Sequence, residues 1–153
     1  MLNERILRKL LKMRQDVEHA ALEDYANAVI TVEQCRQQLQ QVEGFRTGYA
    51  GDLLRKSTGA RIRMTVYSSY QSFLGKLDGI IARQERTLEA LKQNAAQKQL
   101  VYFEKRKQRQ IIDSLLEQFL KNQAIAEGRA EQKLNDDLTN SKYARARMEN
   151  DPT

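Results

Sequence analysis

The sequence has few residues that interrupt helices, and few cysteines and histidines, which commonly act as nucleophiles, acid–base catalysts or metal ligands. One proline, Pro152, one cysteine, one histidine and no tryptophan occur in 153 residues. Because proline breaks helices, its absence before residue 152 permits very long ones. A single cysteine excludes an intrachain disulfide and a cysteine metal cluster, and it favours a reducing compartment such as the cytoplasm.

Catalytic constellations are missing as well. His19 is expected on an outer helix face and Cys35 within an apolar pattern, so neither has partners for a catalytic triad. The glycines lack the Gly-Lys-Ser/Thr ending of a phosphate-binding loop, and Asp136-Asp137 is an isolated acidic pair. We therefore expect no enzymatic activity, no catalytic residues, no cofactor and no bound metal.

Long hydrophobic runs are absent too, since no stretch approaches the roughly 18 apolar residues of a membrane-spanning helix. This predicts a soluble protein. The N-terminal dozen residues mix leucines with Arg5, Arg8, Lys9 and Lys12, as targeting peptides or membrane-surface helices do. Their heptad phase continues into the next segment, so we interpret them as the start of the first helix.

The pattern that is present is an apolar repeat at alternating three- and four-residue steps, broken once near Ser57-Thr58-Gly59. It predicts an all-α fold in which two long helices form an antiparallel coiled-coil hairpin with a C-terminal helical overhang. One domain is expected over 1–153, with helix one at about 2–54, the turn at about 55–65, helix two at about 66–142 and a disordered tail at about 143–153. The repeat consists of Val32, Cys35, Leu39, Val42, Tyr49 and Leu53, with Arg46 between them, and of Leu74, Leu77, Ile81, Gln84, Leu88, Leu91, Ala95, Tyr102, Ile112, Leu116 and Phe119.

A turn at this break sets the register of the two helices. Facing residue numbers then sum to roughly 123, which pairs Cys35 with Leu88 and Leu39 with Gln84. The same register brings Glu18 near Lys105, so the middle of the seam is polar and is expected to bend there. Beyond about Lys121 helix two has no partner helix, and we expect another protein to complete it.

Aromatic residues and glycines concentrate near the turn. Phe45 and Phe73 lie beside the seam, so each should leave an edge exposed, as protein-binding hot spots do. Seam packing is the alternative for these aromatics. Glycines share outer faces on both helices, where they allow close approach of a partner, soften the rod or are simply tolerated. They are Gly44, Gly48 and Gly51 on helix one and Gly75 and Gly79 on helix two.

Basic residues form two clusters within a chain of formal charge +6. The register places the clusters side by side, which favours an acidic protein surface or a polyanion as partner, against the alternative of a solvated face. No aromatic platform, zinc spacing or helix-turn-helix accompanies them, so we expect no nucleic-acid partner. The clusters are Arg5, Arg8, Lys9, Lys12 and Arg14, and Lys105, Arg106, Lys107 and Arg109.

Against this background the sequence resembles the FliJ family, a coiled-coil component of the bacterial flagellar type III export apparatus. The resemblance covers nearly the whole chain, and its most specific part is the aromatic spacing. The matching residues are Tyr67-x-x-Tyr70-Gln71-x-Phe73-x-x-x-Leu77-x-x-Ile80 with Gln84 and Leu88, then Gln38-Leu39, Val42-x-x-Phe45-x-x-x-Tyr49, Phe103-Glu104-Lys105 and the block from Glu127 to Leu138.

The resemblance implies a hairpin similar to the gamma subunit of rotary ATP synthases, inserted as a central stalk into the hexameric export ATPase (FliI-like) with its regulator (FliH-like). It further implies contact with the cytoplasmic domain of the export gate FlhA and handling of empty export chaperones. The location implied is cytoplasmic, at the inner face of the inner membrane, with membrane association through partners only. The gate-binding residues would be Gln38, Val42, Phe45, Tyr49, Phe73, Leu77, Ile80 and Gln84.

We expect the basic clusters to bind the ATPase ring. The residues concerned are Arg5, Arg8, Lys9, Lys12, Lys105, Arg106, Lys107 and Arg109. Two alternatives remain for the function, besides a purely structural scaffold that self-associates through the C-terminal overhang. The injectisome counterpart, the YscO family, shares the length, the hairpin and the role. A protein of a different class, a basic coiled coil that binds nucleic acid or anionic membrane, would also carry these clusters.

Overall fold

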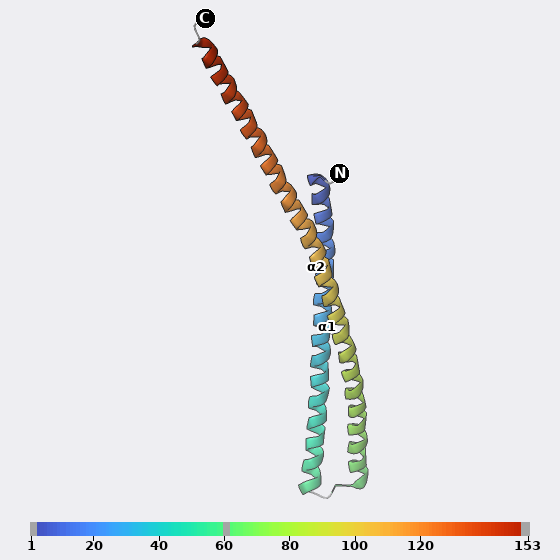
Figure 1. The fold of residues 1–153 in the computed structure, drawn as a ribbon. Coiled ribbons are helices and arrows are strands. Elements are labelled where there is room, and N and C mark those ends of the chain that lie inside the picture. Colours follow the sequence, from blue (N-terminus) through green and yellow to red (C-terminus); the bar gives the residue numbers. More distant parts are fainter. Residues whose placement is uncertain (1–2, 60–61, 151–153) are drawn as a thin grey trace. The chain divides into compact units, whose positions relative to one another are not determined.

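The computed structural model describes residues 3–59 and 62–150, which form two long helices and no strand (Figure 1). Helix α1 runs from Glu4 to Gly59 and helix α2 from Met64 to Glu149. The first helix begins where Asn3 caps it, because the Asn3 Oδ1 accepts a hydrogen bond of 2.9 Å from the backbone N–H of Ile6. The predicted all-α fold with two antiparallel helices is confirmed.

The helix ends differ from the prediction. Residues 55–59 are helical rather than part of the turn, and the hydroxyls of Ser57 and Thr58 donate to the carbonyl oxygen of Leu54 within this last turn of the helix. Residues 143–149 belong to α2, so the prediction of a disordered tail is wrong for them. Alanine, arginine, methionine and glutamate in this stretch favour helix. The predicted start at residue 2, part of the turn (60–61) and the last three tail residues (151–153) lie outside the described residues.

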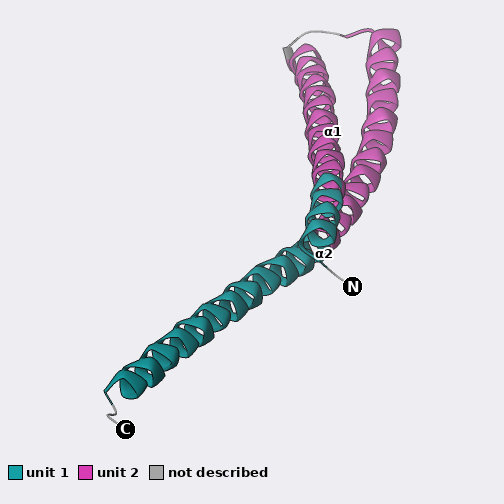
Figure 2. Cartoon of the chain, turned by 90° about the horizontal axis from the view of Figure 1, so that it is seen from above, with its two compact units in different colours: residues 1–16, 106–153 teal, residues 17–105 magenta. Residues whose placement is uncertain are grey.

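The predicted single domain divides into two compact units, each containing parts of both helices (Figure 2). We call residues 17–105 the loop unit, and residues 1–16 with 106–153 the terminal unit. The division falls where the seam is polar, between Arg14 and Glu18 on α1 and between Lys105 and Arg109 on α2. The bend expected there stays a prediction.

In the loop unit the two helices pack through a single apolar seam. Cys35, Leu39 and Leu88 are buried together, and Val32, Ile81 and Leu91 pack against them. The Cys35 thiol donates to the Gln84 Oε1 at 3.7 Å, which adds a contact across the helices. These neighbours confirm the predicted register of this part of the hairpin.

Alanines continue the seam of the loop unit in the stretches where the repeat of large apolar residues is weakest. Ala21, Ala28 and Ala95 are buried. Alanine occurs at seam and surface positions alike, so the apolar pattern of larger residues did not reveal Ala21 and Ala28. The polar stretch of the seam is therefore shorter than predicted.

In the terminal unit, Leu7 and Leu116 are buried, and the Arg14 Nη1 donates to the Gln108 Oε1 at 2.9 Å. From Lys121 to Asn150 every residue of α2 is exposed. This exposed stretch is the one for which the sequence analysis expected no partner helix within the chain. None of the described helices combines the length and apolar character that a membrane crossing requires.

Candidate protein-docking surfaces

An aromatic group lies in the loop unit, where α1 and α2 both contribute rings. The Tyr49 ring packs on Phe73 with centroids 4.7 Å apart and on Tyr70 at 6.0 Å, both tilted. Phe45 lies one turn before Tyr49 and is 66% exposed, and Phe73 is 40% exposed. The exposure expected for Phe45 and Phe73 is confirmed. Phe45 and Phe73 therefore expose apolar ring surface to water next to the packed seam, a feature that is typical of protein-binding hot spots.

The eight residues predicted to bind a partner around this group differ in accessibility. We call them the aromatic surface. Leu77 is only 8% exposed, so little of its side chain is accessible to a partner in this conformation. The exposed members are Gln38, Phe45 and Phe73, and the half-buried ones are Val42, Tyr49, Ile80 and Gln84.

An ion pair across the helices fixes α1 against α2 beside the aromatic surface. The Arg46 Nε donates to the Asp78 Oδ1 at 2.5 Å. This hydrogen bond lowers the pKa of the Asp78 carboxyl and raises the pKa of the Arg46 guanidinium, with direct charge attraction adding to both. Both groups are solvent-exposed, so the pair contributes to register more than to stability. Sequence analysis placed Arg46 in the seam without identifying its partner.

A shallow groove of about 520 Å³ runs along α1 beside Phe45. Gly44 and Gly48 form part of its lining, and a Cβ built on either residue meets no atom within 4 Å. The remaining lining residues are Gln41, Phe45, Tyr49 and Asp52. The missing side chains therefore leave room at the surface rather than relieving a clash inside the protein.

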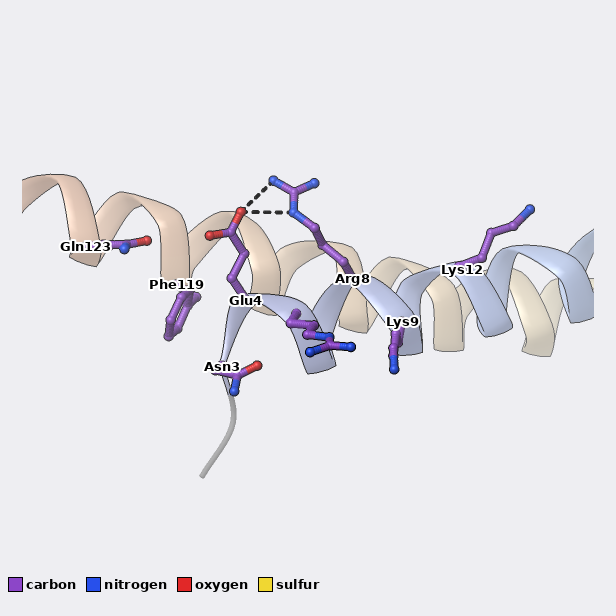
Figure 3. A pocket seen from close by; sticks show the side chains of 8 residues that line it. Asn3, Glu4, Arg8, Lys9, Lys12, Phe119 and Gln123 are labelled. Carbon is purple, nitrogen blue, oxygen red and sulfur yellow. Dashed lines mark hydrogen bonds and ion pairs between the residues drawn. The ribbon is translucent and has the colours of Figure 1, made fainter.

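Four basic residues of the terminal unit, all on α1, line a groove of about 730 Å³, which we call the basic groove (Figure 3). Phe119 and Gln123 of α2 lie at one end of it. Lys105 belongs to the loop unit, and the remaining seven of the predicted ATPase-ring residues belong to the terminal unit. The groove residues on α1 are Asn3, Glu4, Arg5, Arg8, Lys9 and Lys12.

A third groove, of about 350 Å³, combines Lys107 of the second basic cluster with two apolar residues that the sequence analysis did not single out, Ile111 and Leu115. Lys107, Ile111 and Leu115 follow one another at four-residue steps on α2 and line it. Ile111 and Leu115 are exposed. The four-residue spacing of Ile111 and Leu115 could have predicted this groove, because apolar residues one turn apart and outside the seam indicate a second apolar face.

The two residues that the sequence analysis considered for chemistry, His19 and Cys35, lie apart on α1. Cys35 is a buried free thiol, and the His19 Nε2 lies 3.2 Å from the Glu23 Oε1 on an exposed helix face. Over residues 3–59 and 62–150, no group of three or more histidine, cysteine, aspartate or glutamate residues could hold a metal ion.

Comparison with known proteins adds one finding. The family model described as "Flagellar FliJ protein" matches residues 4–148. No curated protein and no solved structure matches the chain. The matched range contains both helices almost completely, so the similarity extends over the aromatic surface and the basic groove alike.

Proposed function

Since this chain belongs to the FliJ family and is therefore a component of the flagellar type III export apparatus, we propose that it acts as the central stalk of the export ATPase hexamer. In this role it regulates the ATPase, links the hexamer to the cytoplasmic domain of the export gate FlhA and handles export chaperones. It works by binding rather than by catalysis. Its place is the cytoplasmic face of the inner membrane, where the ATPase and its FliH-like regulator hold it.

The observation that carries the proposal is the separation of two kinds of surface. The aromatic surface belongs to the loop unit, whereas the basic groove belongs to the terminal unit. Exposed aromatic rings are typical of specific protein contacts, and clustered cations favour acidic surfaces. Two dissimilar surfaces on one chain suit a protein that connects two different partners.

A stalk without an active site can still change the rate of an ATPase. Subunits of a hexamer in different nucleotide states present different surfaces, and a ligand that binds one state more tightly shifts the population toward it. The shift is limited by the difference between the two affinities. The basic groove would supply that difference at the ring, while the aromatic surface engages the gate.

ATP hydrolysis by the purified export ATPase of the same organism, with and without the full-length chain, tests this proposal. We expect added chain to raise the hydrolysis rate several-fold and to promote hexamers, because both effects follow from preferential binding to assembled subunits. Mass photometry of the same mixtures reports the hexamers. A folded chain that leaves rate and assembly unchanged over a wide concentration range would contradict the stalk role.

Substitution of Gly44 and Gly48 by alanine tests whether the groove beside Phe45 receives a partner. Each change should raise the free energy of unfolding by roughly 0.5–1 kcal/mol, because alanine is the better helix former and the space is open. If a partner approaches the backbone here, the same variant should bind the FlhA cytoplasmic domain less tightly. Urea unfolding and calorimetric titration measure the two effects.

Gly75→Ala with Gly79→Ala is the matched control, since these α2 glycines also face open space and line none of the three grooves described above. We expect equal stabilisation and unchanged gate binding. Gate binding that is unchanged in both double variants would mean that glycine is merely tolerated at Gly44 and Gly48.

A further inference from the structure

The cations of the basic groove differ in whether they already have an acidic neighbour. The Arg8 Nη2 lies 2.9 Å from the Glu4 Oε1, and the Lys12 Nζ lies 2.9 Å from the Asp16 Oδ1. Arg5 and Lys9 form no ion pair with any residue of the ranges 3–59 and 62–150. The four cations look equivalent in the sequence, but Arg8 and Lys12 each have a carboxylate partner, whereas Arg5 and Lys9 have none among the described residues.

The pairing follows from the four-residue period of the helix surface. Residues 4, 8, 12 and 16 form one row along α1, in which two carboxylates balance two cations. The neighbouring row contains Arg5, Lys9 and the exposed Met13, so it carries two positive charges and an apolar side chain. Figure 3 shows the Lys9 side chain directed away from those of Arg8 and Lys12.

An incoming carboxylate meets different conditions at the two rows. At Arg8 it is repelled by Glu4, or else it must displace the Glu4 carboxylate from an existing ion pair. At Arg5 and Lys9 no such exchange is required. The N-terminus of α1 adds positive potential near Arg5, since its backbone N–H groups point out of the first turn. Attraction for an acidic group is therefore concentrated on Arg5 and Lys9.

The groove also supplies an apolar contact. Phe119 of α2 is half-buried and lines the same groove as Arg5 and Lys9. Side chains four residues apart on a helix lie about 6 Å from each other, so Arg5 and Lys9 match carboxylates with similar spacing. The two positive charges and the neighbouring aromatic ring together favour a ligand that has carboxylates beside an apolar group.

We propose that Arg5, Lys9 and Phe119 form the docking site for an acidic segment of a partner protein, with two carboxylates about one helical turn apart beside an apolar side chain. The inference rests on the proposed function, in which the export ATPase is that partner. It assigns the ATPase contact to two cations and leaves Arg8 and Lys12 to the internal stability of α1.

The test compares variants of the full-length chain that each lose two positive charges. R5Q/K9Q should weaken binding to the purified export ATPase by about tenfold or more, as loss of close charge pairs at interfaces does. R8Q/K12Q should weaken it by no more than about threefold, because those charges are already compensated. R83Q/R86Q, on α2 and outside the groove, should bind as the unchanged chain does. Circular dichroism confirms that each variant is helical.

Salt provides a second readout. Affinity of the unchanged chain should fall between about 50 and 300 mM NaCl because screening weakens exposed charge pairs. R5Q/K9Q should lose most of this dependence, whereas R8Q/K12Q should retain it. F119L, which keeps an apolar side chain but removes the ring, should weaken binding without changing the salt dependence.

Three outcomes would overturn the proposal. If R5Q/K9Q and R8Q/K12Q lose affinity equally, the cations act as an undivided positive surface, and the stalk function is unaffected. If the unchanged chain neither binds nor stimulates the ATPase, the proposed function fails and this site fails with it. If R5Q/K9Q binds the ATPase normally but loses binding to a duplex DNA probe, the groove is a polyanion site.

Discussion

Replacing Leu39 by alanine should lower the free energy of unfolding by about 2–3 kcal/mol, the largest stability effect that we expect from one truncation. Leu39 is 8% exposed and lies between Cys35 and Leu88 at the centre of the seam. A two-helix seam has no second layer of side chains behind it. The cavity left by Leu39→Ala is therefore not refilled by other core residues, and urea unfolding followed by circular dichroism measures the loss.

Leu54→Ala is the matched control, because Leu54 lies on the same helix and is 65% exposed. The same atoms are removed, but little buried area is lost, so the change should stay within about 0.5 kcal/mol. Equal destabilisation by the two variants would mean that the seam does not hold the loop unit together as the structure indicates.

The double variant Phe45→Ala with Phe73→Ala should reduce affinity for the FlhA cytoplasmic domain by about a hundredfold or more, as truncation of central aromatic anchors does. Both rings are exposed, so neither substitution creates a large cavity in the seam. Phe73 also loses its contact with Tyr49, which we expect to cost stability modestly. Stimulation of the export ATPase should persist, because the basic groove lies in the other unit. Calorimetric titration and hydrolysis rates measure the two effects separately.

Phe103→Ala controls for the loss of an exposed ring, since Phe103 is 48% exposed in the loop unit and is not part of the aromatic surface. It should leave gate binding unchanged. Equal loss of gate binding and ATPase stimulation in the Phe45 and Phe73 variant would refute the division of labour between the two surfaces. Unchanged gate binding would remove the aromatic surface from the proposal.

The seam was predictable because its physics is local and periodic. Leucines and valines at three- and four-residue steps can be buried only on one face of a helix, and a single break between two such runs leaves an antiparallel pair as the simplest solution. Cys35, Leu39 and Leu88 therefore meet as expected. The burial of Ala21 and Ala28 was not predicted, since alanine has too little apolar area to identify the buried face of a helix.

The helix ends were less predictable, because they depend on small differences between competing hydrogen bonds. The sequence analysis placed Ser57 and Thr58 in the turn. In the structure their hydroxyls donate to the Leu54 carbonyl oxygen, and the helix continues to Gly59. Residues 143–149 are all exposed, and the sequence analysis expected them to be disordered. Their helix propensity is sufficient to extend α2 to Glu149.

Residue type and spacing along one chain were enough to indicate two long helices, an apolar stripe on each, an excess of positive charge and exposed aromatic residues near the turn. Which side chains remain accessible to a partner depended on the folded arrangement of the helices. Leu77 is buried in the seam, and Arg46 is paired with Asp78. Arg8 is paired with Glu4, whereas Arg5 forms no ion pair with residues 3–59 and 62–150. Availability depends on neighbours in three dimensions, and composition cannot specify those.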